Sequence, residues 1–496
     1  TQTADGGHDS RKTRGDIFAS VRAATQKLVG SYALGVVCRD FPDRLICARK
    51  ESPLIVGLGK NENFIASDVP AVLEYTREVY FLEQNEMAVL YTDHVDLFTS
   101  EGEKIVRFPS HVDWDISSAE KGGYAHFMLK EIFEQPKALH DTLASHLICD
   151  KNGNPRTLSF SDEIDDADFE KMIHNTKRIV ITACGTAYHA GMVGKYAFEK
   201  YARIPTLVDV ASEFRYRDPI LEKDDVFIVV SQSGETADTL AALRLAKSRG
   251  SKVIAITNCV GSTVSRESDY VIYTLAGPEI AVASTKAYTT QLMCLYMLSI
   301  LFGKVRGVIS SPDFANLLSE LEAIPENAQK ILDNQTEIQK FASCQFNKEK
   351  IFYIGRQFDS ANSLESALKL KEVSYMHCEA FSAGELKHGP IALVDKNTLV
   401  IAIATEPSLY EKLISNIIEV KSRGAATMVI TNDSTGSFDD CCDSVIQIPS
   451  GNSEFSNALE SMLSVIPAQL FAYYCSVLRG NDPDKPRNLA KSVTVE

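Results

Sequence analysis

A run of hydroxyl and amide side chains lies where an apolar strand gives way to a helix. The strand Val226–Val230 leads directly into Ser231–Thr236 (Ser-Gln-Ser-Gly-Glu-Thr), and a helical pattern follows. Gly234 permits a tight turn there, and the free N–H groups at a helix start favour an anion. Three hydroxyls and one amide add donors, so the loop can bind a phosphate without a lysine. The alternative is that these residues only cap an ordinary strand-to-helix turn.

Two further loops of the same region place hydroxyls ahead of a helix. They are Cys184–Ala187 (Cys-Gly-Thr-Ala) and Val282–Lys286 (Val-Ala-Ser-Thr-Lys). Because α/β sheets bind ligands at the carboxyl ends of their strands, we expect the three loops to form one site. The matching loop of the second half, Ile403–Ser408, differs: Glu406 would repel phosphate, and Pro407 lacks an N–H. Only the first half is therefore expected to bind phosphate.

Acid–base chemistry is indicated by Glu365, Lys369 and Glu372, whose i, i+4, i+7 spacing puts them on one face of a predicted helix. On an isolated helix, such a stripe is more often a solvated salt-bridge face. The segment that follows, Phe381–Pro390, is a glycine-punctuated loop that presents His388, and histidine titrates near neutral pH. A carboxylate beside a lysine and a histidine suits proton transfer next to a carbonyl.

Lys491, in the patternless C-terminal segment, is a further candidate. A lysine in such a segment is usually solvated. A desolvated lysine can instead form a Schiff base with a ketose carbonyl. The residues alone leave both interpretations open.

The elements that must position these residues change in character along the chain. Residues 1–15 are polar and are expected to be disordered at least in part, and from residue 16 to about 106 a short helix precedes β-rich segments. Residues 120–148 are predicted to be helical, and Asp150–Asp166 is predicted to be a linker.

From Lys177 onward, apolar strands alternate with amphipathic helices, and the alternation recurs after a helical bridge near Leu317–Ala342. This order predicts an α/β fold with two doubly wound parallel sheets. The similar order of the two halves indicates an internal duplication, with the repeats facing each other.

Composition narrows the classes of function. A chain of 496 residues suggests about three domains. The net charge of −15 argues against a nucleic-acid surface, and apolar runs such as Val226–Val230 and Thr398–Ile403 are too short to span a membrane. Eleven scattered cysteines indicate a reduced, cytoplasmic protein. Cys441 and Cys442 lack companions at zinc spacing, so no metal site is expected.

Taken together, these motifs resemble the isomerizing glutamine–fructose-6-phosphate aminotransferases, a family also called glucosamine-6-phosphate synthases. The resemblance extends from about Asp16 to Glu496. It rests on Gly185-Thr186, Ser231–Thr236, Val282–Lys286, Gly384–Pro390 and the ending Pro486–Glu496.

The resemblance implies an N-terminal glutaminase domain of the N-terminal-nucleophile type, followed by two sugar isomerase (SIS) domains. The expected boundaries are a partial glutaminase domain at 1–120, a helical segment and linker at 121–170, SIS domains at 171–310 and 345–481, and a tail at 482–496.

Members of the family convert fructose 6-phosphate to glucosamine 6-phosphate, by amination and ketose–aldose isomerisation, with ammonia from glutamine. By resemblance, Glu372 would move the proton, with Glu365 and Lys369 beside it. His388 would open the sugar ring, reaching into the site of a partner subunit, and Lys491 would form the Schiff base. The implied sugar- and phosphate-binding residues are Gly185, Thr186, Ser231, Gln232, Ser233, Thr236, Val282 and Ser284. The resemblance implies a homodimer or higher homo-oligomer and no cofactor, pyridoxal phosphate included.

The sequence departs from the family pattern at two places. Ala187 stands where the family usually has Ser, which removes a hydroxyl near the sugar. The family nucleophile is an N-terminal Cys, whereas residue 1 is Thr1 in a stretch that matches the middle of the glutaminase domain. The chain is therefore expected to be a fragment of a longer protein. Alone, it would isomerise fructose 6-phosphate to glucose 6-phosphate.

Two other functions remain as alternatives. A non-catalytic phosphosugar-binding regulator would keep Ser231–Thr236 but would not need Glu372, His388 and Lys491 together. A simple phosphosugar isomerase would not explain the β-rich N-terminal region.

Overall fold

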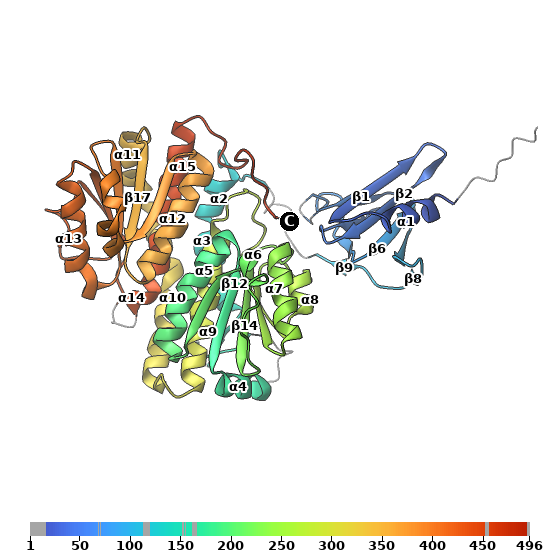
Figure 1. Cartoon of the computed structure of the whole chain (residues 1–496), viewed down its shortest axis with the longest axis horizontal. Coiled ribbons are helices and arrows are strands. Elements are labelled where there is room, and N and C mark those ends of the chain that lie inside the picture. The colour runs from blue at the N-terminus through green and yellow to red at the C-terminus, as the bar shows by residue number, and fades with distance from the viewer. Residues whose placement is uncertain are drawn as a thin grey trace, which may run out of the picture. The chain divides into compact units, whose positions relative to one another are not determined.

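The computed structural model (Figure 1) describes residues 16–67, 69, 71–112, 120–150, 153, 155–160, 166–451 and 456–493. The described residues up to 112 form one compact unit, and those from 120 to 493 form a second. The segment 1–15, expected to be disordered, lies outside the described residues.

The first unit contains one helix and two antiparallel sheets, with strand orders β1-β2-β6-β7-β8 and β4-β3-β5-β9. The short helix and the strands predicted for this region are confirmed. Their bounds are α1 (Ile17–Thr25), β1 (Tyr32–Cys38), β2 (Phe41–Lys50), β3 (Ile55–Leu58), β4 (Asn63–Ala66), β5 (Glu78–Phe81), β6 (Glu86–Leu90), β7 (Val95–Thr99), β8 (Lys104–Ile105) and β9 (Ser110–His111).

Alternating side chains of β2 build two layers of core in this unit. Ile46 and Ala48 pack in one cluster with Val21 of α1. Cys47, which points to the opposite face, packs in another cluster with Val56 of β3. The period of two along a strand therefore places α1 on one side of the first sheet and the second sheet on the other.

The second unit contains two five-stranded parallel sheets with the same topology. Their orders, β13-β12-β14-β15-β16 and β18-β17-β19-β20-β21, both follow the sequence pattern 2-1-3-4-5. The predicted internal duplication is confirmed. The strands are β12 (Arg178–Ala183), β13 (Thr206–Val210), β14 (Asp225–Ser231), β15 (Lys252–Thr257), β16 (Tyr270–Tyr273), β17 (Lys350–Gly355), β18 (His377–Ser382), β19 (Thr398–Ala404), β20 (Ala426–Thr431) and β21 (Ser444–Gln447).

Helices cover both faces of each sheet, as expected for a doubly wound fold (Figure 1). The helices are α2 (Phe127–Phe133), α3 (Gln135–Ala144), α4 (Asp166–Asn175), α5 (Gly185–Ala197), α6 (Ala211–Phe214), α7 (Ala237–Ser248), α8 (Thr263–Glu267), α9 (Lys286–Val305), α10 (Ser311–Asp333), α11 (Gln335–Gln345), α12 (Phe358–Ser374), α13 (Tyr410–Lys421), α14 (Ser456–Glu460) and α15 (Val465–Leu478).

One hydrophobic cluster is shared by the two repeats. It takes Ile228 and Ile254 from the first sheet and Ile351 and Ile401 from the second, together with side chains of α5, α9, α12 and α15. The opposite faces have clusters of their own, with α6 and α7 on the first sheet and α13 on the second. The helix pair α5 and α12 meets across this shared core, so the repeats face each other as predicted.

The prediction of a helix over 120–148 followed by a linker is wrong in part. A short hairpin replaces the end of that helix and part of the linker: β10 (Leu147–Cys149) pairs with β11 (Pro155–Leu158), with Leu147 opposite Leu158. Leu158 is buried in the shared core. Burying this side chain gives the hairpin a contact that its polar sequence did not indicate.

One apolar segment, Asn457–Leu478, is much longer than the strand-length runs considered in the sequence analysis. This helical run of 22 residues is long and apolar enough to cross a membrane by composition, and 83% of its most apolar window is buried inside the protein. Its C-terminal part, α15, packs against α12 and α11. The apolar composition thus serves the core between the repeats.

We expect Gly303→Ala in α9 to destabilise the second unit by about 1–3 kcal/mol, because the new methyl group has no room. The Cβ of an alanine at position 303 would lie 2.3 Å from the carbonyl oxygen of Tyr201, a backbone atom that cannot rotate away. Thermal unfolding measures the effect as a lower Tm. Ser319→Ala, on an exposed turn of α10, is the control and should leave Tm nearly unchanged. Equal Tm values for the two variants would contradict the packing argument.

Candidate functional site

The loop Ser231–Thr236 lies at the carboxyl end of β14, beside the turn from β12 into α5. β12 and β14 pair in parallel, with Thr182 opposite Val229, so their following loops emerge at the same edge of the sheet. α7 begins directly after Thr236. Free N–H groups and hydroxyls therefore gather at one edge, which is the arrangement that phosphate binding requires.

The shape of this loop depends on Gly234. Its φ of +67° lies in the left-handed region, and a Cβ there would lie 2.1 Å from Ser262 Oγ. The Gly234 N–H donates to Ser231 Oγ at 3.0 Å, and Ser231 Oγ lies 3.3 Å from Thr236 Oγ1. On the outer side, the Glu235 carboxylate accepts the N–H of Thr263 at 2.8 Å. The loop is thus held in a tight curve with its hydroxyls close together.

The C-terminal segment, which sequence patterns left as a plain tail, crosses the same edge of the sheet. Ser492 Oγ lies 3.2 Å from Ser233 Oγ, and the carbonyl of Val493 accepts the N–H of Ala237 at 3.4 Å. Earlier in the segment, the carbonyl of Asp484 accepts the N–H of Val282 at 3.0 Å. The tail therefore brings Lys491 to the predicted phosphate loop.

The three side chains predicted to share one face of α12 lie together as a cluster of neighbours. Lys369 Nζ lies 2.6 Å from Glu372 Oε2 and 3.5 Å from Glu365 Oε1. It also donates to Thr186 Oγ1 at 2.9 Å, and Thr186 in turn donates to Glu365 Oε1 at 3.1 Å. Because Thr186 lies at the start of α5, this cluster joins the first repeat to the second.

Burial excludes a solvated salt-bridge stripe. The side chains of Lys369 and Glu365 are 1% and 0% exposed, whereas that of Glu372 is 21% exposed. Burial alone would lower the pKa of Lys369, but the charges of Glu372 and Glu365 outweigh it and raise this pKa above its usual value. Lys369 is therefore a permanent positive charge, and Glu372 is the carboxylate of the cluster that reaches solvent.

His189 belongs to this cluster and was missed from the sequence. Its Nδ1 lies 2.8 Å from Glu365 Oε2, so α5 contacts this carboxylate through both His189 and Thr186. His189 sits at i+3 from Thr186 on α5. That spacing puts the two residues on one face of the helix, which is the only local signal that could have identified His189.

The Lys491 side chain is mostly buried, and its amine is paired. Its Nζ lies 2.5 Å from Glu279 Oε2 and donates to the carbonyl of Ala281 at 2.8 Å, and its side chain is 21% exposed. Glu279 in turn accepts the N–H groups of Thr285 and Ala287, at the start of α9. Burial favours a raised pKa for Glu279, but the Lys491 charge and these hydrogen bonds outweigh it, so its pKa is lowered.

Glu279 also connects the two clusters. Besides its contact with Lys491, its charge contributes to the raised pKa of Lys369. Electrostatic coupling between buried groups falls off with distance, so the Lys491 and Lys369 clusters lie within reach of each other. The C-terminal tail, the loop before α9 and the α12 face therefore border one region.

The remaining predicted sugar-binding residues lie around this region. Gly185, with a φ of +55°, begins α5 next to Thr186. Val282 and Ser284 lie in the loop that carries Glu279. The carbonyl of Gln232 accepts the N–H of Asn258, which fixes its backbone while its side chain stays partly exposed. Ala187, the departure from the family pattern, packs its methyl group against the shared core.

His388 lies in another part of the second repeat. It ends the 3₁₀-helix η3 (Ala383–His388), is exposed, and lines a hollow of about 420 Å³ with Tyr196, Ser382 and Glu385. Among the described residues, no hydrogen bond or ion pair joins it to Glu372 or Lys491. The structure of one chain thus leaves the predicted ring-opening role of His388 untested.

The corresponding edge of the second repeat is filled by its own carboxylate. Asp359 Oδ2 accepts the N–H of Thr405 at 2.8 Å, and Oδ1 accepts its hydroxyl at 2.6 Å. Burial raises the pKa of Asp359 to about 6. Here the chain itself supplies a carboxyl group at the carboxyl edge of the sheet, and the expectation that only the first repeat binds phosphate stays a prediction.

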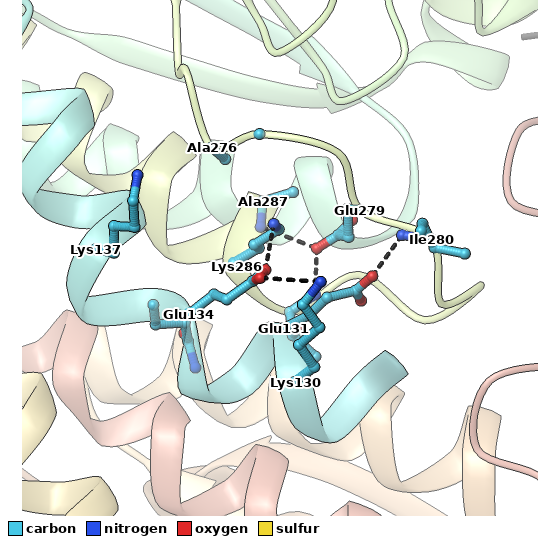
Figure 2. Close-up of polar contacts among 12 residues, drawn as sticks. Lys130, Glu131, Glu134, Lys137, Ala276, Glu279, Ile280, Lys286 and Ala287 are labelled. Atoms are coloured by element: carbon cyan, nitrogen blue, oxygen red, sulfur yellow. Dashed lines mark hydrogen bonds and ion pairs between the residues drawn. The ribbon is translucent and has the colours of Figure 1, made fainter. Parts of the chain in front are cut away.

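A separate polar network, also missed from the sequence, borders the Lys491 cluster (Figure 2). Glu131 of α2 accepts the N–H groups of Ile280 and Ala281, the second at 3.1 Å. One helical turn later, Glu134 pairs with Lys286 at 2.7 Å. No sequence pattern singled out these carboxylates, because their partners lie about 150 residues away.

Within the residues that the structure describes, no group of three or more His, Cys, Asp or Glu side chains could hold a metal ion. Cys47, Cys294, Cys378 and Cys475 are buried free thiols.

Comparison with known proteins identifies both repeats. The SIS domain family model matches residues 172–301 and 346–479. The isomerizing glutamine–fructose-6-phosphate aminotransferase of Caldanaerobacter subterraneus subsp. tengcongensis is 54% identical over 482 residues, which cover 97% of this chain and 77% of that protein.

Solved structures agree with this relationship. The C-terminal domain of glucosamine-fructose-6-phosphate aminotransferase from Francisella tularensis matches with a TM-score of 0.68 and 38% identity, over 74% of this chain and 100% of that one. A glucosamine-6-phosphate deaminase from Thermotoga maritima matches with a TM-score of 0.56 and 27% identity, over 74% and 99% of the two chains. The chain belongs to the isomerizing glutamine–fructose-6-phosphate aminotransferase family.

Proposed function

We propose that this protein is an enzyme that converts fructose 6-phosphate to glucosamine 6-phosphate, using ammonia derived from glutamine. The observations that carry this proposal are contacts at the carboxyl edge of the first sheet. The C-terminal segment meets the Ser231–Thr236 loop through Ser492, and its Lys491 amine is held by Glu279. Lys369, which pairs with the Glu372 carboxylate, donates to Thr186 at the start of α5. A phosphorylated ketose needs an anion site, a carbonyl-activating group and a base, and these groups supply them in that order.

In the proposed mechanism, the Ser231–Thr236 loop binds the phosphate, with Gly185, Thr186, Val282 and Ser284 around the sugar. The Lys491 amine attacks the C2 carbonyl, and water leaves as the imine forms. Ammonia then replaces Lys491 at C2, which releases the lysine. Without ammonia, water hydrolyses the imine and isomerisation alone results.

Glu372 acts as the base in the proposed isomerisation step. Its carboxylate removes a proton from C1 and returns it to C2, while the proton of the C1 hydroxyl passes to the nitrogen at C2, or to the oxygen there without ammonia, and the ketose skeleton becomes the aldose. Lys369 stays charged throughout, because two carboxylates surround it, and it stabilises the negative charge that develops between C1 and C2. Glu365 holds Lys369 in place and has no direct role in the chemistry.

We further propose that the first unit, with its two antiparallel sheets, is part of the glutaminase domain that releases ammonia. The relatives' shared name begins with glutamine, and the similarity to them extends over 97% of the chain, including this unit. His388 would open the sugar ring in the site of a partner subunit, within a homodimer or higher homo-oligomer. Its exposure on the surface of η3 supports a role across an interface. We also propose a cytoplasmic location.

A non-catalytic phosphosugar-binding regulator is the second candidate. Such a regulator would bind phosphate through the Ser231–Thr236 loop. The contacts between the two repeats would then only stabilise the fold. The buried ion pairs of Lys369 and Lys491 favour the enzyme, because burying these charges is costly and binding a phosphate alone does not need them. Turnover of fructose 6-phosphate separates the two functions.

Loss of a hydroxyl from the phosphate loop should weaken binding of the substrate. Thr236→Val keeps the side-chain shape but removes a donor to a charged group, so we expect the KM for fructose 6-phosphate to rise about 10- to 100-fold. Steady-state kinetics measures this KM. Ser408→Ala, in the corresponding exposed loop of the second repeat, is the matched control and should keep the wild-type KM. A similar KM in both variants would remove Thr236 from the phosphate site.

Replacement of the proposed base should stop turnover without preventing binding. We expect Glu372→Gln to reduce kcat by at least about 10²-fold, because the amide cannot accept the proton from C1. Binding of fructose 6-phosphate, measured by calorimetry, should remain detectable. Glu419→Gln, a half-buried carboxylate of α13 that pairs with Lys387, is the control. Wild-type kcat in Glu372→Gln would assign the proton transfer to another group.

Borohydride reduction in the presence of fructose 6-phosphate should trap an adduct on Lys491. Reduction converts the imine to a stable secondary amine, which peptide mass mapping locates. Lys491→Arg should give no adduct, whereas the exposed Lys485→Arg in the same tail should be labelled like the wild type. An adduct that persists in Lys491→Arg would show that the covalent step uses a different amine.

A further inference from the structure

The carboxyl group of Glu131 supports the loop that holds Lys491, although it does not touch Lys491 through any hydrogen bond of the described residues. Glu131 Oε1 accepts the N–H groups of Ile280 and Ala281. The residue before them, Glu279, binds Lys491 Nζ through its carboxylate, and Ala281 binds it through its carbonyl. Glu131 Oε1 thus fixes the backbone between the two groups that hold the amine, and Figure 2 shows its contact with Ile280.

This support comes from a distant part of the chain. Glu131 lies on α2, ahead of the first sheet, whereas its partners precede α9 and Lys491 lies in the C-terminal segment. The carboxylate of Asp484 accepts the N–H groups of Phe127 and Met128, so the same segment also caps the start of α2. The helix, the loop and the tail therefore form one closed set of contacts around the Lys491 amine.

We propose that Glu131 is a positioning residue for Lys491 and that it acts as an uncharged carboxyl group. In this form it fixes the Glu279–Ala281 loop without placing a second negative charge beside the amine. The inference rests on the proposed function, since it assigns Glu131 to the Schiff-base step.

The surroundings of Glu131 favour the uncharged form. Its side chain is buried, and Oε2 has no hydrogen-bond partner among the described residues. An ionised carboxylate with an unsatisfied buried oxygen costs much more than the protonated group, because a charge is buried in addition to a polar atom. Burial, and then the charge of Glu279, raise the pKa of Glu131 to about 8, against the opposing effects of Lys491 and the two N–H groups.

Other charged groups near this carboxyl are already paired. Glu279 and Lys491 face it directly. Two ionisable groups near Glu131 lie beside it in the chain, Lys130 and Glu134. Lys286 lies at the start of α9, and Asp484 and Lys121 lie near the start of α2. His126 lies just before α2 and contacts Tyr473 of α15. Glu134 pairs with Lys286, and Asp484 pairs with Lys121, so Glu131 is the carboxyl whose ionisation adds net charge beside Lys491.

Ionisation of Glu131 should therefore slow the step that uses the free amine. A second carboxylate next to Lys491 favours its ammonium form, which cannot attack a carbonyl, and it also repels Glu279 across the loop. Glutamine keeps the acceptor oxygen of Glu131 and never ionises. Alanine removes the acceptor and leaves two buried N–H groups unpaired.

The test compares the pH dependence of borohydride trapping on Lys491 in the wild type, Glu131→Gln and Glu131→Ala, with fructose 6-phosphate as the ligand. Below pH 7, we expect Glu131→Gln to trap at the wild-type rate within about twofold, and Glu131→Ala to trap about tenfold or more slowly. As the pH passes about 8, the ratio of Glu131→Gln to the wild type should rise. Asp141→Asn, a half-buried carboxylate of α3 that pairs with Lys137, is the control and should keep a ratio of one to the wild type.

Both proteins keep Lys491 and differ in whether residue 131 can ionise, so a merely structural role of Glu131 would leave the ratio of their rates constant with pH. A Gln-to-wild-type ratio that stays constant from below pH 7 to above pH 8, or wild-type trapping in a folded Glu131→Ala protein, would overturn the inference. The Tm of each variant establishes folding. Absence of any Lys491 adduct in the wild type would instead overturn the Schiff-base step, and the role of Glu131 would fall with it.

Discussion

The buried ammonium of Lys369 is the contact on which the geometry of the site depends. It binds Glu372 and Glu365 on its own helix and Thr186 on α5 of the other repeat. Removing one partner of such a buried ion pair typically costs about 3–5 kcal/mol, because a charge is left without compensation. Two repeats that share only a hydrophobic core could slide against each other at little cost. The directional contacts of Lys369 fix how Glu372 faces the phosphate loop.

The duplicated fold allows the division of labour that the proposed function requires, in which one sheet edge binds the ligand and its copy carries the catalytic side chains. Both sheets have the same strand order, so both present N–H groups at the same edge. In the second repeat, Asp359 satisfies the N–H and hydroxyl of Thr405 and fills that position. In the first repeat, Ser231–Thr236 leaves the position to a ligand. An internal carboxylate thus stabilises one copy and frees α12, which follows directly from this edge, to carry Lys369 and Glu372.

Local patterns predicted the elements and the α12 face but not the contacts that give this face its chemistry. The strand predicted at Val226–Val230 lies within β14, which extends it by one residue at each end. The i, i+4, i+7 spacing correctly joined Glu365, Lys369 and Glu372, yet the same spacing suits a solvated helix, and only the contact with α5 buries it. Glu279 lies 212 residues from Lys491, and Glu131 lies on a short helix whose charges look like surface residues. No local signal encodes such distant pairings.

The two lysines of the site differ in ways that suit different tasks. Lys369 is 1% exposed, is paired with two carboxylates and a hydroxyl, and has a raised pKa, so it remains an ammonium that can only stabilise charge. Lys491 is 21% exposed and is held by one carboxylate and one carbonyl. An amine must lose its proton before it attacks a carbonyl, and one carboxylate opposes that loss less than two do. An uncharged Glu131 preserves this difference, because its ionisation would add a second negative charge near Lys491, although without direct contact.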